Sequence, residues 1–166
     1  MENLVDLISQ HQGSLFAFLY RTCGDADLAE DLMQETFVRA LRASKRYRPQ
    51  ATVTTWLFSI AANLVRDHWR RRARRGEELP LDEAALNALE NPEEDALRGM
   101  QHQRVQAALL SLPLEQRSAL ILRYYHDLSY QQIAQVLVCP LGTVRSRIHN
   151  GLVRLKEILV TEVSPS

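Results

Sequence analysis

Basic and polar side chains gather near the start of a predicted helix close to the C-terminus. These side chains are Arg145, Arg147, His149 and Asn150. Arginine and asparagine donate hydrogen bonds to base edges, so a helix that carries them in its first turns suits the major groove of DNA. The residues expected to bury this helix recur at helical spacing on another side: Val144, Ile148, Leu152 and Leu155. The pattern predicts a helix that reads duplex DNA.

A shorter predicted helix precedes this one, and together the two form a helix-turn-helix. Ser129 caps the shorter helix, with Gln132 as its capping-box partner. The run 138–142 then breaks the helix, and Pro140 suits the first turn of the next one. The apolar face of the shorter helix is Ile133, Ala134 and Leu137. The alternative is a short helical hairpin with a solvated arginine face, but the cap, the turn and the charges together favour DNA binding.

A second basic surface is predicted on a helix of about residues 55–75. Its apolar stripe is Leu57, Ile60, Ala61, Leu64 and Val65. The opposite face carries Trp56, Ser59, Asn63, Arg66 and Arg70, and the loop before it adds Lys45, Arg46, Tyr47 and Arg48. Arginine neutralises phosphates, and an aromatic ring stacks on unpaired bases for roughly 1–3 kcal/mol each. A solvated basic helix end near the C-terminal dipole explains two or three arginines, so this larger number favours nucleic acid.

An acidic face is predicted on the helix between about residues 25 and 44. It consists of Asp27, Glu30, Asp31, Gln34 and Glu35. Asp31 and Glu35 are four residues apart and therefore adjacent, which costs a little stability and is compatible with a basic protein partner. A solvated acidic face explains the pattern equally well. A site for a hard cation is the weakest alternative, because neither a histidine nor a second carboxylate-bearing helix is evident nearby.

Composition excludes several classes of protein. The chain has 166 residues, of which 46% are hydrophobic, and no apolar run approaches the roughly 18 residues of a membrane span. We expect no secretory signal, because the N-terminal residues show no basic region followed by an apolar stretch. Cys23 and Cys139 form no metal-type pair, which favours a reducing cytoplasm. The sequence has no Gly-rich phosphate loop, nucleophile elbow or zinc-spaced histidine pair. We expect neither an enzyme nor a cofactor or metal site.

The zero net charge conceals four blocks of alternating sign. Residues 1–39 carry −5, residues 40–76 carry +9, residues 77–100 carry −7 and residues 101–166 carry +3. Such segregation indicates different partners at different places. Helical periodicity dominates and no strand pattern is sustained, so we expect an all-α fold of two small domains. The expected boundaries are 1–76 for the first domain, 77–91 for an acidic linker and 92–166 for the helix-turn-helix domain.

Three motifs, taken in order, resemble the extracytoplasmic-function class of bacterial sigma factors. They are DADLAEDLMQETFVRAL (25–41), TTWLFSIAANLVRDHWRRRARR (54–75) and LPLEQRSALILRYYHDLSYQQIAQVLVCPLGTVRSRI (112–148). The resemblance covers nearly the whole chain. It implies a dissociable, non-catalytic subunit that directs bacterial core RNA polymerase to promoters. It also implies an anti-sigma protein as a partner that masks the chain.

The resemblance implies three sets of contacts. The acidic helix would bind the clamp helices of the large polymerase subunit through Asp31, Gln34 and Glu35. The −10 promoter element would be melted and held by Arg48, Thr55, Trp56, Ser59, Asn63 and Arg66, with Trp56 as the wedge, and the basic face adds Arg70. The −35 element would be read as duplex by Tyr130, Thr143, Arg145, Ser146, Arg147, His149 and Asn150.

Two departures and two rival functions accompany this interpretation. The loop RPQATVT lacks the Gly and the aromatic that family members often carry, with Val53 near the aromatic position. The loop therefore does not identify which base is flipped out of the −10 element. Position 149 varies in the family, so the residue there does not identify the −35 sequence.

Two rival functions are considered. They are a stand-alone helix-turn-helix regulator and a nucleic-acid enzyme with carboxylate-bound metal. The first rival needs neither the acidic face nor the 55–75 helix.

Overall fold

The computed structural model describes residues 4–47, 52–76 and 96–163, and within these ranges the chain is helical, with no strand. The all-α prediction is confirmed. The expected linker 77–91, the helix start at Asn91 and the contact residue Arg48 lie outside the described residues. None of the helices in the described ranges is long and apolar enough to cross a membrane.

The N-terminal half is a bundle of α1 (Leu4–Gln10), α2 (Gln12–Cys23), α3 (Ala26–Arg42) and α4 (Val53–Arg75), with a short 3₁₀ helix at Ser44–Arg46. The sequence predicts one helix where α1 and α2 stand. The chain breaks at His11 instead, beside Gly13, whose helix propensity is low. The sequence predicts that α3 begins at Asp25 or Asp27, and Asp25 is the cap, accepting from Leu28 N at 3.2 Å. Gly76 ends α4, as the sequence predicts, and does so in the left-handed conformation.

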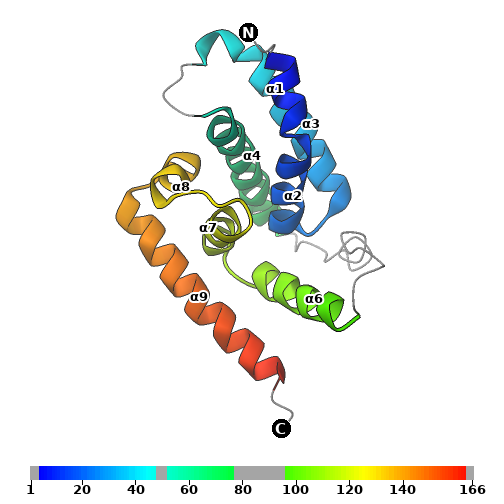
Figure 1. The fold of residues 1–166 in the computed structure, drawn as a ribbon, viewed down its shortest axis with the longest axis vertical. Coiled ribbons are helices and arrows are strands. Elements are labelled where there is room, and N and C mark those ends of the chain that lie inside the picture. Colours follow the sequence, from blue (N-terminus) through cyan, green and yellow to red (C-terminus); the bar gives the residue numbers. More distant parts are fainter. Residues whose placement is uncertain (1–3, 48–51, 77–95, 164–166) are drawn as a thin grey trace.

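The C-terminal half comprises α6 (Ala96–Leu110), α7 (Leu114–Tyr124), α8 (Tyr130–Leu137) and α9 (Leu141–Val163). Figure 1 shows α9 as a long helix along one side of this half, with α7 and α8 between it and the N-terminal bundle. The predicted ends of α6 near Leu110 and of α7 near His126 agree with these bounds to within two residues.

One core cluster joins the two halves. It contains Phe18 and Phe58 from the N-terminal bundle together with Ile121 and Ile133 from the C-terminal half. His126, after α7, lies against both phenylalanine rings, with centroids 6.1 and 4.9 Å away. The acidic and basic surfaces on α3, α4 and α9 are therefore held on a single packed body in this structure.

The sequence predicts a buried face of α3 that consists of Leu28, Leu32, Met33, Phe37, Val38 and Leu41, and two of these residues are exposed. Val38 and Leu41 face outward, and the inward positions are taken by Thr36 and Ala40. Thr36 tolerates burial because its hydroxyl donates to Leu32 O at 2.7 Å within the same helix. A threonine satisfied in this way behaves as a small apolar residue, which shifts the buried stripe of α3 by one position.

Candidate nucleic-acid interface

The helix-turn-helix is built by local hydrogen bonds that the sequence predicts. Ser129 Oγ accepts from Gln132 N at 3.1 Å, and Gln132 Oε1 accepts from Ser129 N at 2.9 Å. This reciprocal capping box fixes where α8 begins. At its other end Val138 adopts a left-handed conformation, with φ of 51°, and Pro140 O accepts from Val144 N at the start of α9. The predicted capping box and turn are both confirmed.

Helix α9 presents a polar surface from its first turns. Val144 and Ile148 are buried and hold the helix against the core. The residues that face solvent include four of the predicted −35 contacts, namely Arg145, Ser146, His149 and Asn150. Tyr130 and Thr143 are half-buried, and the Tyr130 ring lies under the Arg123 guanidinium, 5.0 Å from its centroid.

The buried stripe of α9 departs from the prediction at Leu152, which is 39% exposed. Gly151 is buried in its place. A Cβ built on Gly151 would lie 3.0 Å from Leu120 Cδ1 on α7, so the absent side chain is what permits this close approach. Because the approach occurs at residue 151, Leu152 turns toward solvent.

Arg147 differs from the other predicted −35 contacts because its guanidinium is already engaged. Its Nη2 lies 3.3 Å from Glu115 Oε2 on α7, and its Nη1 donates to Cys139 Sγ at 3.5 Å. The sequence gives no sign of either contact, because Glu115 is 32 positions away and Cys139 belongs to the turn.

The start of α4 carries an aromatic pair that is suited to stacking. The rings of Trp56 and Tyr47 have centroids 4.7 Å apart and planes inclined by 39°. Sequence reasoning placed Tyr47 only among the residues of the preceding loop, although an aromatic beside basic residues is a usable signal for base stacking. The pair stands beside Thr52, which caps α4 by accepting from Thr55 N at 3.1 Å.

Not all of the residues predicted to contact the −10 element are exposed to solvent. Asn63 and Arg70 are exposed, and Trp56 and Ser59 are half-buried. Thr55 is only 3% exposed, and its hydroxyl lies 2.9 Å from Thr52 Oγ1 within the cap. The structure thus places Thr55 in the scaffold of the helix start, because a cap brings the third residue of the helix back toward the capping hydroxyl.

Arg66 lies at the joint between the two halves. Its Nη2 donates to Leu137 O, the last residue of α8, at 2.9 Å. The face of α4 opposite its apolar stripe is therefore covered at this point by the helix-turn-helix. The sequence places Arg66 on this basic face but cannot show that a second half packs against it there.

The joint has further polar contacts. Gln106 Nε2 donates to Arg21 O at 3.0 Å, and the Arg21 guanidinium lies 4.1 Å from the centroid of the Tyr125 ring. Arg117 donates to Thr22 O from across the joint. Burial lowers the pKa of His126 to about 4, with a smaller effect in the same direction from Arg21. The imidazole beside the two phenylalanine rings is therefore neutral at pH 7.

The acidic face of α3 is open. Asp31, Gln34 and Glu35 are exposed, and Glu35 Oε1 accepts from Arg39 Nε at 3.1 Å, four residues along the helix. Within the described ranges, no group of three or more potential metal-ligating side chains is found. Burial raises the pKa of the Cys23 thiol to about 12, so this cysteine is held as the unreactive thiol.

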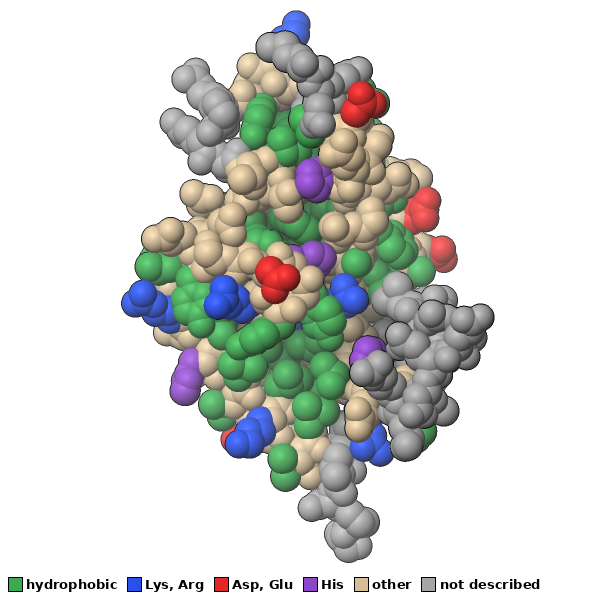
Figure 2. Space-filling model, in the orientation of Figure 1, with side chains coloured by type: hydrophobic (Ala, Val, Ile, Leu, Met, Phe, Trp, Pro, Cys, Tyr) green, Lys and Arg blue, Asp and Glu red, His purple; other side chains and the backbone are tan. Residues whose placement is uncertain are grey.

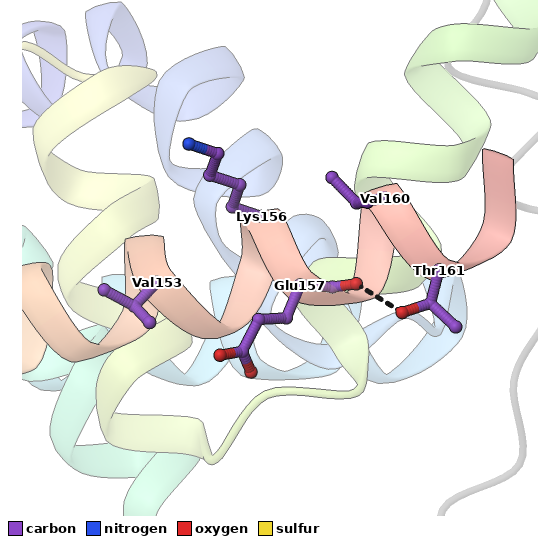
Figure 3. A pocket seen from close by; sticks show the side chains of 5 residues that line it. All are labelled: Val153, Lys156, Glu157, Val160 and Thr161. Atoms are coloured by element: carbon purple, nitrogen blue, oxygen red, sulfur yellow. Dashed lines mark hydrogen bonds between the residues drawn. The ribbon is translucent and has the colours of Figure 1, made fainter. Parts of the chain in front are cut away.

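The far end of α9 carries a different kind of surface. Figure 2 shows hydrophobic side chains gathered on the lower half of this face of the molecule, and the exposed apolar residues of α9 are Leu152, Val153 and Val160. A shallow pocket there is lined by Val153, Lys156, Glu157, Val160 and Thr161 (Figure 3). The Thr161 hydroxyl donates to Glu157 O at 2.7 Å, so this hydroxyl is satisfied by the helix backbone.

Comparison with known proteins identifies the class to which this arrangement belongs. Residues 7–75 match the sigma-70 region 2 family, and residues 102–155 match sigma-70 region 4. The chain is 42% identical over 161 residues to the ECF RNA polymerase sigma factor SigE of Mycolicibacterium smegmatis, across 96% of this chain but 62% of SigE. It is 34% identical to the ECF sigma factor EcfG of Rhodopseudomonas palustris, across 97% of this chain and 87% of EcfG.

Two solved structures share the arrangement of helices. One is the sigma factor RpoE of Bartonella quintana in complex with the anti-sigma factor NepR, with a TM-score of 0.81 and 26% identity across 99% of this chain and all of that one. The other is CnrH in complex with the cytosolic domain of CnrY, with a TM-score of 0.67 and 25% identity across 96% and 88% of the two chains. The chain belongs to the ECF family of RNA polymerase sigma factors.

Proposed function

We propose that this chain binds bacterial core RNA polymerase and directs it to promoters through three separate helical surfaces. The exposed acidic face of α3, made of Asp31, Gln34 and Glu35, docks on the polymerase. The aromatic and basic face of α4 holds the melted −10 element, and the first turns of α9 read the −35 element. The polymerase carries out the chemistry, so this chain acts by binding in the cytoplasm, where bacterial transcription takes place.

The observation that carries the proposal is the exposed surface of α9. Arg145, Ser146, His149 and Asn150 stand together in solvent while Val144 and Ile148 anchor the same turns. An anchored helix with arginine and asparagine at its exposed start is the arrangement with which helix-turn-helix proteins enter the major groove. A stand-alone regulator has the same feature, but it leaves the acidic face of α3 and the Tyr47–Trp56 pair without a role.

An anti-sigma protein is a further proposed partner. Of the structural relatives described above, RpoE was solved in complex with the anti-sigma factor NepR, and CnrH was solved in complex with the cytosolic domain of CnrY. The surfaces that polymerase and promoter require are also the surfaces that such a protein would have to mask.

Run-off transcription with purified core polymerase tests the proposed function. We compare the wild type with an Asp31→Ala/Glu35→Ala double variant on a pool of promoter fragments. The wild type should give discrete start sites, and the double variant should lose them through weaker binding to the core. Because the Glu35–Arg39 pair is exposed, its loss should cost the fold less than about 1 kcal/mol.

A matched control separates the loss of the α3 docking surface from the general effect of removing two negative charges. The Asp6→Ala/Glu157→Ala variant removes two exposed carboxylates from α1 and α9 and should initiate like the wild type. Wild-type protein that is folded but starts no transcript above core polymerase alone would overturn the proposed function. Equal losses in both double variants would refute the assignment of α3 as the docking surface.

A further inference from the structure

Arg147 lies on the flank of α9 and not on its solvent-facing side. At roughly 100° per residue, position 147 is about 60° around the helix from the buried Val144, whereas position 146 is about 160° from it. The exposures agree with this placement, since the Arg147 side chain is 20% exposed while Arg145 and Ser146 are exposed residues. Arg147 thus points along the seam between α9 and its neighbours.

A single guanidinium joins three segments at this seam. One end of Arg147 contacts Glu115 in the first turn of α7 at 3.3 Å. The other end donates to Cys139 Sγ, in the turn between α8 and α9, at 3.5 Å. Because the guanidinium is planar and its donors are fixed relative to one another, two contacts at opposite ends restrain its orientation. Together they restrain how α9 is rotated against α7 and against the turn.

Base reading makes a competing demand on the same atoms. An arginine that recognises guanine donates two parallel hydrogen bonds to O6 and N7. Two of the five donors of Arg147 are already directed at Glu115 and Cys139, and its side chain is only 20% exposed, so a bidentate contact with a base would require the guanidinium to move. Arg145 makes no ion pair or side-chain hydrogen bond within the described part of the chain, so its donors are available for a base edge.

We propose that Arg147 is a positioning residue and that Glu115, through it, sets the angle at which α9 meets the −35 element. This inference rests on the proposed function, because it concerns the same DNA-reading surface. Base recognition then falls to the exposed residues of α9, which are Arg145, Ser146, His149 and Asn150.

The proposal and simple electrostatics predict different results for the variant Glu115→Gln. Glu115 is 62% exposed, beside the surface proposed to meet DNA. If the carboxylate only repels phosphates, Glu115→Gln raises the affinity for every DNA sequence alike. If it positions Arg147, the same change lowers the discrimination between preferred and other −35 sequences, because α9 is no longer held at one angle.

The test uses holoenzyme reconstituted from core polymerase and a promoter library randomised across the −35 element. Wild type is compared with Glu115→Gln, Arg147→Ala and the double variant. Glu157→Gln serves as a control that removes one exposed carboxylate from α9, away from the Arg147 contact. We expect the two single variants to lower the enrichment of preferred sequences about two- to fivefold, the range that a partly exposed ion pair supplies. The loss should spread over several adjacent base pairs.

The double variant should be no worse than Arg147→Ala alone, because both changes remove the same contact, and Glu157→Gln should match the wild type. Loss of preference at a single base pair in Arg147→Ala, with Glu115→Gln unchanged, would make Arg147 a base reader and overturn the proposal. Tighter binding of all sequences by Glu115→Gln, with unchanged preference, would also overturn it. Wild-type holoenzyme that enriches no sequence would instead overturn the proposed function, and with it this inference.

Discussion

Replacement of Arg117 by leucine should destabilise the protein strongly. Arg117 is 6% exposed, and its guanidinium donates to four backbone carbonyls. In the C-terminal half these are Leu109 O at 3.0 Å, Leu110 O at 3.0 Å and Leu112 O at 2.9 Å, and the fourth is Thr22 O across the joint. These carbonyls stand at or just beyond the ends of α6 and α2, where the helix itself provides no donor.

The magnitude follows from the fate of each carbonyl. Leu109 O also accepts from Leu112 N at 3.1 Å and so stays satisfied in Arg117→Leu. The other three lose this donor. A buried acceptor without a partner costs about 1–3 kcal/mol, and the bond to Leu110 O is only partly buried. Leucine restores part of the aliphatic packing, so the lower end of that range applies to each carbonyl. We expect a loss of about 3 kcal/mol, a large part of the roughly 5–15 kcal/mol that holds a domain folded.

Urea denaturation followed by circular dichroism measures this loss directly. Arg104→Leu, at an exposed position of α6, is the control and should change the free energy of unfolding by less than about 0.5 kcal/mol. Arg117→Lys should lie between leucine and wild type, because an ammonium keeps the charge but cannot span four carbonyls with a planar fork. A loss below about 1 kcal/mol for Arg117→Leu would refute the view that this guanidinium holds the helix ends together.

Three further outcomes are expected. Ser129→Ala should cost about 1 kcal/mol by removing the cap of α8, measurable by the same denaturation, whereas an unchanged midpoint would mean that the capping box contributes nothing. The pKa of His126 is about 4 in the folded protein, and its ordinary value is 6.5. Above pH 6.5 the imidazole is neutral in both the folded and the unfolded state, so its titration costs the folded protein no stability there. The stability of the protein should fall by about 1–2 kcal/mol toward pH 4, after allowance for solvent screening; His126→Gln should flatten this fall, and an identical pH profile in the variant would contradict the assignment. Tyr47→Ala and Trp56→Ala should each weaken holoenzyme binding to a fork template with an unpaired −10 strand by roughly 1–3 kcal/mol, with duplex −35 binding as the internal reference.

The parts of the fold that the sequence predicts are those decided by local chemistry. The capping box of Ser129 and Gln132, the cap at Asp25 and the left-handed Gly76 each depend on residues within four positions of one another. A cap needs only a side-chain oxygen and a nearby amide, so a short stretch of sequence contains all the information. The element types and most boundaries follow for the same reason.

The parts that the sequence does not predict depend on neighbours far along the chain. Leu152 is apolar at the expected spacing, yet the close approach of α7 at Gly151 turns it outward. Arg147 has the residue type of a base reader, and only the folded position of Glu115 shows that it is engaged. Hydrophobic periodicity identifies a face within about one residue but not which neighbour covers it.

The contact between Arg66 and Leu137 O links the two surfaces that we propose to bind DNA, and it limits when both can bind. Under the proposed function, the guanidinium that donates to Leu137 O is not available to neutralise a phosphate, so Arg66 must leave this carbonyl before it contacts the −10 element, and separation of α8 from α4 releases it. The same movement breaks the contacts of Arg117 with Thr22 O and of Arg21 with the Tyr125 ring. It also exposes the apolar core shared by the two halves, which opposes the opening. Under the proposed function, the free energy that separates the halves must come from binding to core polymerase, and the residues of the joint determine how much is needed.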